Sequence, residues 1–384
     1  MKARSIQGRS LAELNEAIEQ SKADGFRPTL AFVFSSAKLD IDAICALLEK
    51  EGVAIFGAST SGEFIDGYQG EGSAAVLLLD IKPEHFTILF EDVGQRNEEE
   101  VSRLMGQEAL LKFKRPAFII AATGNIETDP LSGEQIIKGL EGAVGKNVSI
   151  TGGLAGNDME FSGTRVFTKQ RKSTKGIMML VLDEDNIEIH GLAVSGWNAL
   201  GTVKYITRVE NDWIRTIDNE PALDVYLKYM GRVSLEGERA IDSFFQFSMA
   251  YPFQVQRANG SVGLCTPVMF NKTDRSIQCE YPLAEGTAFR FSVPPDFDIV
   301  EEVIARSAEV KDAQKADADA LLVFSCIGRL LNLGPMANEE LEGLHTLWNA
   351  PMAGFYTYGE FGRAKGEGQE FHSTTISWVT LKEK

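Results

Sequence analysis

The sequence predicts a mixed α/β protein made of two related domains, each with βαβ units and appended antiparallel strands. Three observations lead to this prediction. Short, fully apolar segments alternate with amphipathic helical segments near both ends of the chain. Two short sequence patterns recur in the same order in the first and last parts of the chain. The chain has 384 residues, of which 44% are hydrophobic, and this is enough for two or three packed domains.

The first block has the pattern of a βαβ unit. Residues 11–18 place apolar side chains on one helical face, and the apolar run 30–34 predicts a strand buried on both faces. Asp40 is a suitable N-cap for the next helix, which should end at Gly52, and residues 53–56 predict a second strand. We expect the following segments to form an antiparallel pair of strands and then a helix: 73–81, 85–93 and 98–112.

A similar order of elements recurs further along the chain. In the middle block we predict a strand, a helix and four more strands: 117–122, 132–143, 148–151, 164–168, 176–182 and 187–194. Near the other end we predict a strand, a helix, a strand and a final antiparallel strand: 320–326, 339–347, 352–355 and 369–381.

The stretch between residues 201 and 295 differs, because it is rich in aromatic residues and short β-like runs, among them 243–247, 261–270 and 287–293. It predicts a meander of strands attached to the last βαβ unit. A domain boundary is expected near Asn219-Glu220-Pro221, so the predicted domains are 28–218 and 219–381.

The recurring patterns indicate an internal repeat. Val33-Phe34-Ser35 matches Val323-Phe324-Ser325, and the loop 57–64 (GASTSGEF) matches the loop 354–361 (GFYTYGEF). The segment 151–158 (TGGLAGND) is a looser version of the same glycine-rich exit from a strand. We therefore expect the strands at 30–34 and 321–324 to occupy equivalent central positions in two related sheets.

The glycine-rich exits are the strongest candidates for a ligand site. Each follows a buried strand, where ligands often bind in α/β sheets. Hydroxyl groups and carboxylates in these loops could bind an amine or another polar small molecule, and the alternative is a tight turn whose Glu accepts hydrogen bonds from backbone amides. The candidate ligand-binding residues are Ser59, Thr60, Gly62, Glu63, Gly153, Asn157, Cys326, Arg329, Tyr356, Tyr358 and Glu360.

Composition and the absence of known motifs argue against several classes of binding partner. The net charge of −17 repels phosphate backbones and anionic lipid surfaces, so we expect neither a nucleic-acid nor a membrane partner. The sequence contains neither a P-loop nor a Gly-x-Gly-x-x-Gly motif, which disfavours nucleotide binding. The four cysteines contain no Cys-x-x-Cys pair and are expected to be reduced thiols in a cytoplasmic protein.

The cysteines and histidines suggest two alternative functions, a reactive thiol and a haem site. Cys326 ends an apolar strand next to Arg329, and this thiol is either an activated nucleophile or a small buried residue. Arg329 is a candidate partner for a ligand carboxylate, which together with a loop Glu would suit an amino acid. No His cluster suggests a metal, and His372 is the first histidine to test as an axial ligand if haem is bound.

At these residues the sequence resembles the FIST family, whose members combine an N-terminal and a C-terminal FIST domain. The segments that carry the resemblance lie in the family's order between about residues 28 and 381: 57–64, 151–158, 218–226 (DNEPALDVY), 251–253 (YPF), 323–329 (VFSCIGR), 354–362 and 370–375 (EFHSTT).

The resemblance implies a sensory module of signal transduction that binds a small ligand such as an amino acid. It also implies an alternative, since some members are described as haem-based nitric oxide sensors. Because the chain leaves no room for a kinase, cyclase or receptor domain, it would signal through a separate protein of such a kind. A small-molecule enzyme that uses Cys326 or a loop carboxylate is the remaining alternative to a non-catalytic sensor.

Overall fold

The computed structural model describes residues 1–124, 131–160, 163–231, 235, 240–257, 260–364, 366 and 368–384. The chain divides into two compact units. Unit 1 contains Met1–Val194, Val300–Phe371 and Thr375–Lys384, and unit 2 contains Ser195–Ile299 and His372–Thr374. Unit 2 is therefore an insertion in the sequence of unit 1, joined by three residues from near the C-terminus.

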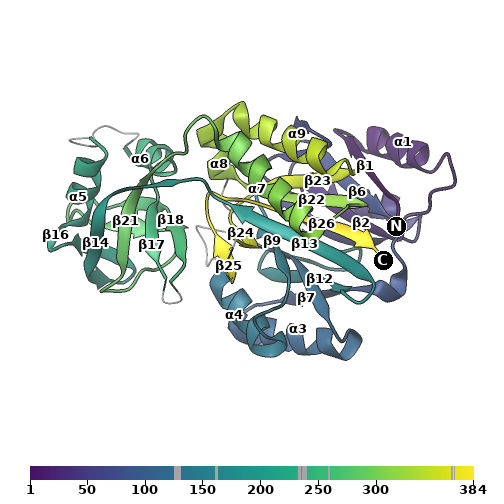
Figure 1. Cartoon of the computed structure of the whole chain (residues 1–384), viewed down its shortest axis with the longest axis horizontal. Coiled ribbons are helices and arrows are strands. Elements are labelled where there is room, and N and C mark those ends of the chain that lie inside the picture. The colour runs from purple at the N-terminus through teal and green to yellow at the C-terminus, as the bar shows by residue number, and fades with distance from the viewer. Residues whose placement is uncertain are drawn as a thin grey trace. The chain divides into compact units, whose positions relative to one another are not determined.

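Unit 1 contains three six-stranded sheets (Figure 1). Sheet 1 has the order β1 (Ala3–Gly8), β6 (Ala74–Leu79), β2 (Leu30–Ser36), β3 (Ala54–Thr60), β10 (Val166–Phe167) and β11 (Lys172–Ser173). Sheet 2 has the order β7 (Phe86–Asp92), β12 (Gly176–Asp183), β8 (Pro116–Ala122), β9 (Ile150–Leu154), β24 (Glu360–Arg363) and β25 (Gln369–His372). Sheet 3 has the order β13 (Ile187–Val194), β26 (Ile376–Glu383), β22 (Ala320–Cys326), β23 (Met352–Thr357), β4 (Glu63–Ile65) and β5 (Tyr68–Gly70).

The three sheets share one pattern of strand pairing. In each, the third and fourth strands are parallel, and the second strand runs antiparallel to the third. The last two strands of each sheet arrive from a neighbouring sheet: β4 and β5 follow β3 but pair with β23, β10 and β11 follow β9 but pair with β3, and β24 and β25 follow β23 but pair with β9. Each sheet thus gives two strands to the next in a closed cycle.

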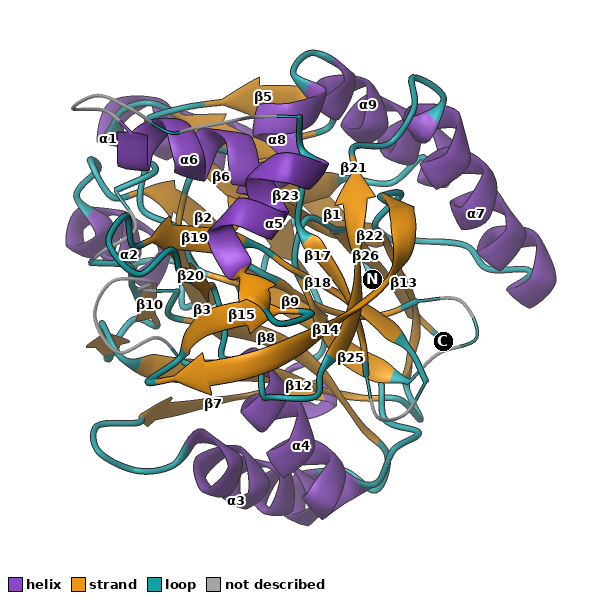
Figure 2. Ribbon diagram, turned by 90° about the vertical axis from the view of Figure 1, so that its left-hand side faces the viewer, coloured by secondary structure: helices purple, strands orange, loops and turns teal. Residues whose placement is uncertain are grey.

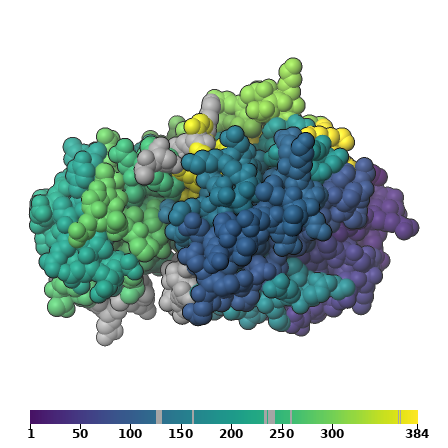
Figure 3. All heavy atoms as spheres, turned by 90° about the horizontal axis from the view of Figure 1, so that it is seen from below, coloured from purple at the N-terminus to yellow at the C-terminus, as the bar shows by residue number. Residues whose placement is uncertain are grey.

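Helices cover the outer faces of these sheets. Helices α1 (Leu11–Ser21) and α2 (Ile41–Glu49) bury Leu14, Ile44 and other apolar residues against sheet 1. Helices α3 (Glu98–Lys112) and α4 (Gly133–Val144) lie side by side below β7 and β12 in Figure 2 and form much of the blue surface in Figure 3. The remaining elements of unit 1 are a short 3-10 helix, Pro83–His85, and helices α7 (Ile299–Gln314, whose first residue falls in unit 2), α8 (Ile327–Leu333) and α9 (Met336–Trp348).

The helices begin where the sequence supplies a cap. Asp40, as expected, accepts a hydrogen bond from the backbone N–H of Ala43 over 3.0 Å, and Ser10, Asn97 and Ser132 make the same contact at the starts of α1, α3 and α4. Such caps satisfy amide groups that the first helical turn leaves unpaired.

The inner faces of the three sheets share one hydrophobic core. Phe34 of β2, Phe324 of β22 and Phe355 of β23 meet there, with ring centroids 4.8 Å apart for Phe34 and Phe355 and 5.7 Å apart for Phe324 and Phe355. Phe34 and Phe324 belong to the two Val-Phe-Ser motifs. Each motif therefore supplies the same kind of side chain to the same core.

The described residues of unit 2 form a β structure with two helices. Its strands are β14 (Asn198–Glu210), β15 (Trp213–Ile217), β16 (Glu220–Pro221), β17 (Phe253–Gln256), β18 (Val262–Cys265), β19 (Pro267–Phe270), β20 (Ile277–Cys279) and β21 (Ala288–Val293), and its helices are α5 (Ala222–Tyr229) and α6 (Ala240–Ser248). Tyr226 lies in its core, with its ring centroid 5.7 Å from those of Phe244 and Phe253.

The predicted mixed α/β class is confirmed, and the strands at 30–34 and 321–324 both lie third in their sheets. Two local predictions were wrong. The strands at 73–81 and 85–93 do not pair, because β6 is already flanked by β1 and β2, and β7 pairs with β12 instead. Residues 243–247, which we expected to form a strand, lie in helix α6. There Phe244 and Phe247 are three residues apart and both contact Tyr226.

Other elements also differ from expectation, among them β1 and the C-terminal tail. Strand β1, which precedes the first predicted helix, was missed because its residues alternate weakly between polar and apolar. The tail predicted as one strand over 369–381 forms two strands, β25 and β26, which belong to different sheets.

Candidate functional site

The loop after β3 holds a buried carboxylate. Glu63 is 1% exposed, and its carboxylate accepts a hydrogen bond of 2.8 Å from the Thr60 hydroxyl and one of 2.7 Å from the backbone N–H of Ser73. The Ser73 hydroxyl also donates to it. Burial raises the pKa of Glu63 to about 7, and the hydrogen bonds from Ser73 and Thr60 oppose that shift. Gly62 makes the turn possible with a φ of +115°.

The loop after β23 repeats this arrangement. Glu360 is fully buried, its carboxylate accepts a hydrogen bond from the Thr357 hydroxyl, and it accepts another of 3.2 Å from the backbone N–H of Thr375. Ser73 directly precedes β6, and Thr375 directly precedes β26. Glu63 therefore links the loop after β3 to the start of β6, and Glu360 links the loop after β23 to the start of β26. Both β6 and β26 are the second strand of their sheet.

After β9, the paired position that corresponds to Glu63 and Glu360 holds an apolar residue. Glu63 is paired with Phe355 and Glu360 with Gly153, and in the third sheet the corresponding pair is Val166 with Ala58. Val166 is fully buried in the central core. Two residues after the paired positions Ala58, Phe355 and Gly153 lie Thr60, Thr357 and Ala155. The Thr and the Glu are thus both replaced by apolar residues in the third loop.

Backbone hydrogen bonds join the three exit loops (the loops after β3, β9 and β23). The N–H of Tyr356 donates to the carbonyl of Gly62 over 2.8 Å, and the N–H of Leu154 donates to that of Gly359 over the same distance. The N–H of Gly156 donates to the carbonyl of Ser59 over 2.9 Å. The structure therefore brings the predicted loop residues together, as a network of backbone contacts.

Their side chains are engaged within this network. The Ser59 hydroxyl donates to the carbonyl of Gly156 over 2.7 Å, and the Tyr356 hydroxyl donates to the side chain of Gln69 over 3.1 Å. The backbone N–H of Asn157 donates to the Tyr358 hydroxyl over 3.2 Å. A Cβ added at Gly153 would lie 2.4 Å from Cγ2 of Thr357, so a larger residue there would clash.

Cys326 ends β22, where it is paired with Thr357 of β23, and Arg329 lies in the first turn of α8. Cys326 is 5% exposed and is a free thiol. Arg329 is fully buried, and its guanidinium donates to the carboxylate of Glu340 through Nε over 2.8 Å and through a second nitrogen. A buried guanidinium needs such a partner.

His372 is the residue that the sequence suggested as a first candidate for an axial haem ligand. This residue is buried in unit 2 and has an interaction partner of its own. Within the described part of the chain, no group of three or more His, Cys, Asp or Glu residues could hold a metal ion.

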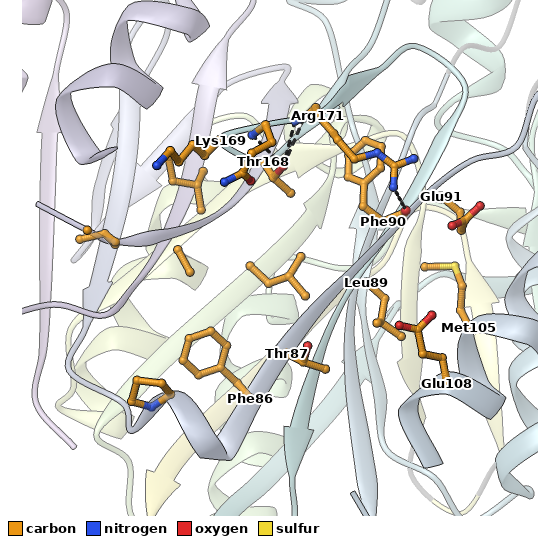
Figure 4. A pocket seen from close by; sticks show the side chains of 17 residues that line it. Phe86, Thr87, Leu89, Phe90, Glu91, Met105, Glu108, Thr168, Lys169 and Arg171 are labelled. Carbon is orange, nitrogen blue, oxygen red and sulfur yellow. Dashed lines mark hydrogen bonds between the residues drawn. The ribbon is translucent and has the colours of Figure 1, made fainter. Parts of the chain in front are cut away.

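A groove of about 670 Å³ lies in unit 1, away from the predicted site (Figure 4). Its walls come from the edge strand β7, from helix α3, from the turn 168–171 between β10 and β11, and from the start of β3. Because β7 ends its sheet, alternate backbone N–H and C=O groups of this strand face outwards. We call this cavity the β7 groove.

Charged side chains of both signs line the β7 groove. The guanidinium of Arg171 lies over the ring of Phe90, 4.6 Å from its centroid, and donates to the Phe90 carbonyl over 2.5 Å. In Figure 4, Glu91 of β7 and Glu108 of α3 lie above and below Met105. Sequence reasoning missed all these residues, because they come from a sheet edge, a helix and a turn that carry no motif.

Two family models match the chain. The model of the FIST N domain matches residues 29–220, and that of the FIST C domain matches residues 222–363. The chain therefore belongs to the FIST family, whose domains are sensory domains of signal-transduction proteins. A comparison with curated proteins gave no match. Among the described residues, no helix is both long and apolar enough to cross a membrane.

Proposed function

We propose that this protein is a non-catalytic sensor that binds a small ligand in the β7 groove. The observation that carries the proposal is the groove itself. Its volume of about 670 Å³ falls in the range of roughly 300–1,000 Å³ that is usual for small-ligand sites. Its lining combines apolar side chains such as Phe86 and Leu89 with a few charged groups, which is typical of such sites.

The charges favour a zwitterion with an apolar part, such as an amino acid. A guanidinium has five N–H donors, and the bond to the Phe90 carbonyl uses one of them, so Arg171 has donors for a ligand carboxylate. Glu108 offers a carboxylate to a ligand ammonium group, and so does Glu91, whose carboxylate also accepts a hydrogen bond of 2.7 Å from Arg96. The apolar side chains between them would contact the ligand's side chain.

The exit loops remain a second predicted ligand position. In our proposal they are scaffold, since the carboxylates of Glu63 and Glu360 already have hydroxyl and amide donors. The shared strand order of the three sheets further supports the proposal that unit 1 is built from three copies of one unit. We also propose that the protein acts in the cytoplasm and passes its signal to a separate protein such as a kinase or cyclase.

A ligand screen tests this function. Thermal-shift measurements over the amino acids and related small zwitterions should identify a stabilising compound, and calorimetry then gives its affinity. We expect Arg171→Gln to weaken binding at least tenfold. Arg115→Gln is the matched control, because Arg115 is an exposed arginine that pairs with Glu184 outside the groove. If both variants bind equally well, the ligand does not occupy the β7 groove.

Two cheap measurements address the alternatives. A Soret band in the purified protein would favour the haem-based gas sensor. Conversion of the bound compound, followed by NMR over hours and abolished by Cys326→Ser, would favour the enzyme.

A further inference from the structure

The outer edge of β7 directs a regular set of backbone groups into the β7 groove. The N–H of Val93 donates to the carbonyl of Lys175 over 2.8 Å, and this bond continues the antiparallel register of β7 with β12. Because backbone direction alternates along an antiparallel strand, the odd-numbered residues of β7 face β12 and the even-numbered ones face the groove. The groove therefore receives the carbonyl of Phe86 and both backbone groups of Ile88 and Phe90.

A side-chain contact agrees with this assignment. Arg171, from the turn across the groove, donates to the carbonyl of Phe90. Among the described residues, the N–H of Phe90 and the N–H and C=O of Ile88 have no hydrogen-bond partner. The unpaired part of the edge thus ends at a guanidinium group.

The edge also lacks the features that usually prevent the addition of a strand. Natural sheets protect their edges with charged residues, proline or bulges. Residues 86–90 (FTILF) contain no charged residue and no proline, and their register with β12 is regular. The first strands of the other two sheets differ, since β1 contains Arg4 and β13 contains Glu188 and His190. The edge of β7 is therefore open to a further strand.

We propose that the ligand of the β7 groove is a short, extended peptide with a free C-terminal carboxylate, which adds to sheet 2 as a strand beside β7. This inference rests on the proposed ligand-binding function and narrows its ligand class. The backbone of the peptide pairs with Ile88 and with the N–H of Phe90, as in other cases of strand addition. Its carboxylate binds the donors of Arg171 that the Phe90 carbonyl does not use.

The position of Arg171 fixes the direction and length of the peptide. Because its guanidinium lies at Phe90, the C-terminus of the peptide lies there, and the peptide runs from Phe86 towards it, parallel to β7. A strand rises roughly 3.3 Å per residue, so the edge between Phe86 and Phe90 spans about 13 Å and takes about four residues. The ammonium group of such a peptide lies at the Phe86 end, away from Glu91.

A length series of ligands tests the proposal by calorimetry on the full-length protein. The probes are alanine and the peptides Val-Ala, Ala-Val-Ala and Val-Ala-Val-Ala, all with free termini, because small side chains leave the backbone to determine affinity. We expect affinity to rise with length, with the tetrapeptide at least about tenfold tighter than alanine. The C-terminal amide of the tetrapeptide should bind at least about tenfold more weakly than the acid, and Arg171→Gln should bind acid and amide equally weakly.

Methylation of single peptide nitrogens tests the strand pairing itself. Every second residue of a paired strand directs its N–H at the neighbouring strand, and the carboxylate at Arg171 prevents a shift of register. Methylation at residues 2 and 4 of the tetrapeptide should therefore have one effect and methylation at residue 3 the opposite one. The nitrogens that face β7 should lose about tenfold in affinity, and the others should lose much less.

A proline tests the edge from the side of the protein. Ile88→Pro removes an N–H that has no partner among the described residues, and proline is tolerated at such edge positions. We expect a folded protein that no longer binds the tetrapeptide. Ile88→Ala is the matched control, because it shortens the same side chain but keeps the N–H, and it should still bind. If Ile88→Pro fails to fold, the methylated peptides decide with the wild-type protein.

The outcomes separate this inference from the proposed function. Equal affinity for alanine and the tetrapeptide, or equal effects of methylation at all three positions, overturns strand addition, and the proposed function survives if an amino acid still binds through Arg171. If no amino acid and no peptide depends on Arg171, both fail. A dimer in analytical ultracentrifugation that the tetrapeptide does not dissociate would assign the edge of β7 to a second copy of the chain and would also overturn the inference.

Discussion

The hydroxyl of Thr60 donates a hydrogen bond of 2.8 Å to the buried carboxylate of Glu63, three residues further along the chain. Thr357 and Glu360 make the same contact in the loop after β23. In the loop after β9, strand pairing places Ala155 and Val166 at these positions. The carboxylate that lies three residues after Ala155, that of Asp158, instead accepts a hydrogen bond from the Ser36 hydroxyl. Where the threonine is present, its hydroxyl and the glutamate carboxylate thus satisfy each other.

Replacing Glu63 by Gln should therefore lower stability. The amide keeps the size of the side chain, but its NH₂ group cannot accept hydrogen bonds, and one of the contacts with Ser73 or Thr60 is lost. A buried polar group without a partner costs about 1–3 kcal/mol in the free energy of unfolding, measurable by urea denaturation. Glu19→Gln, on the exposed face of α1, is the control; it loses only a solvent-exposed ion pair with Lys22 and should cost less than about 1 kcal/mol. Unchanged stability combined with weaker ligand binding would instead make Glu63 a ligand residue.

Copying the third loop gives a second test. Thr60→Ala and Glu63→Val should each destabilise the protein, because each leaves a partner unpaired in a buried site. The double variant removes both groups, as Ala155 and Val166 do in the third loop. Its loss should be smaller than the sum of the single losses, with a coupling energy of roughly 0.5–3 kcal/mol. Purely additive losses would show that the two side chains do not depend on one another.

The raised pKa of Glu63 predicts a dependence of stability on pH. Its pKa is 4.5 ordinarily and about 7 in the folded protein, so the folded state binds the proton more tightly. This contribution is fully present below pH 4.5 and is lost as pH rises through 7; it amounts to roughly 3 kcal/mol. Urea titrations between pH 5 and 8 should show a weaker decline in Glu63→Gln than in the wild type.

Glu280 must be separated from this effect, because its pKa is also raised to about 7 by burial. The variant Glu280→Gln should remove a second part of the decline, and the double variant should remove both. An unchanged pH profile in Glu63→Gln would mean that Glu63 titrates near its ordinary value.

The sequence predicted most strands and helices of unit 1, because buried strands and amphipathic helices have clear periodicity. It could not predict how the sheets are joined. The short strands β4, β10 and β24 each follow one sheet and pair with another, and no local pattern encodes that exchange. The sequence likeness between the first and last blocks was visible, whereas that of the middle block was only loose.

The candidate site was only partly predictable. The exit loops were recognised from their glycines and carboxylates, and they do lie together. Whether a carboxylate is free for a ligand depends on its donors, and one donor to Glu63, the N–H of Ser73, lies ten residues away in the chain. No sequence motif marks the β7 groove, because Arg171 and Glu108 come to line one cavity only through the packing of different elements.

Glycine substitutions test the close approach of the strands. Gly152 has a φ of +149°, and a Cβ there would lie 2.0 Å from the carbonyl oxygen of Ile120 on the adjacent strand. Gly152→Ala should therefore abolish folding or severely reduce soluble expression. Gly142, in helix α4, has open space at its Cβ position, and Gly142→Ala should raise stability by about 0.5–1 kcal/mol. A well-folded Gly152→Ala would contradict the tight pairing of β8 with β9.

The last prediction concerns Arg329, which the sequence suggested as a carboxylate-binding residue and which the structure pairs with Glu340. Arg329→Met should cost about 3–5 kcal/mol, because it leaves Glu340 as a buried charge without its partner. Adding Glu340→Leu removes that charge and should restore most of the lost stability, since replacing both members of a buried ion pair by apolar residues is often neutral. Thermal denaturation and ligand calorimetry of the single and double variants separate the two roles. If the double variant is stable and binds the ligand as tightly as the wild type, the pair is structural. If it is stable but has lost binding, Arg329 contacts the ligand.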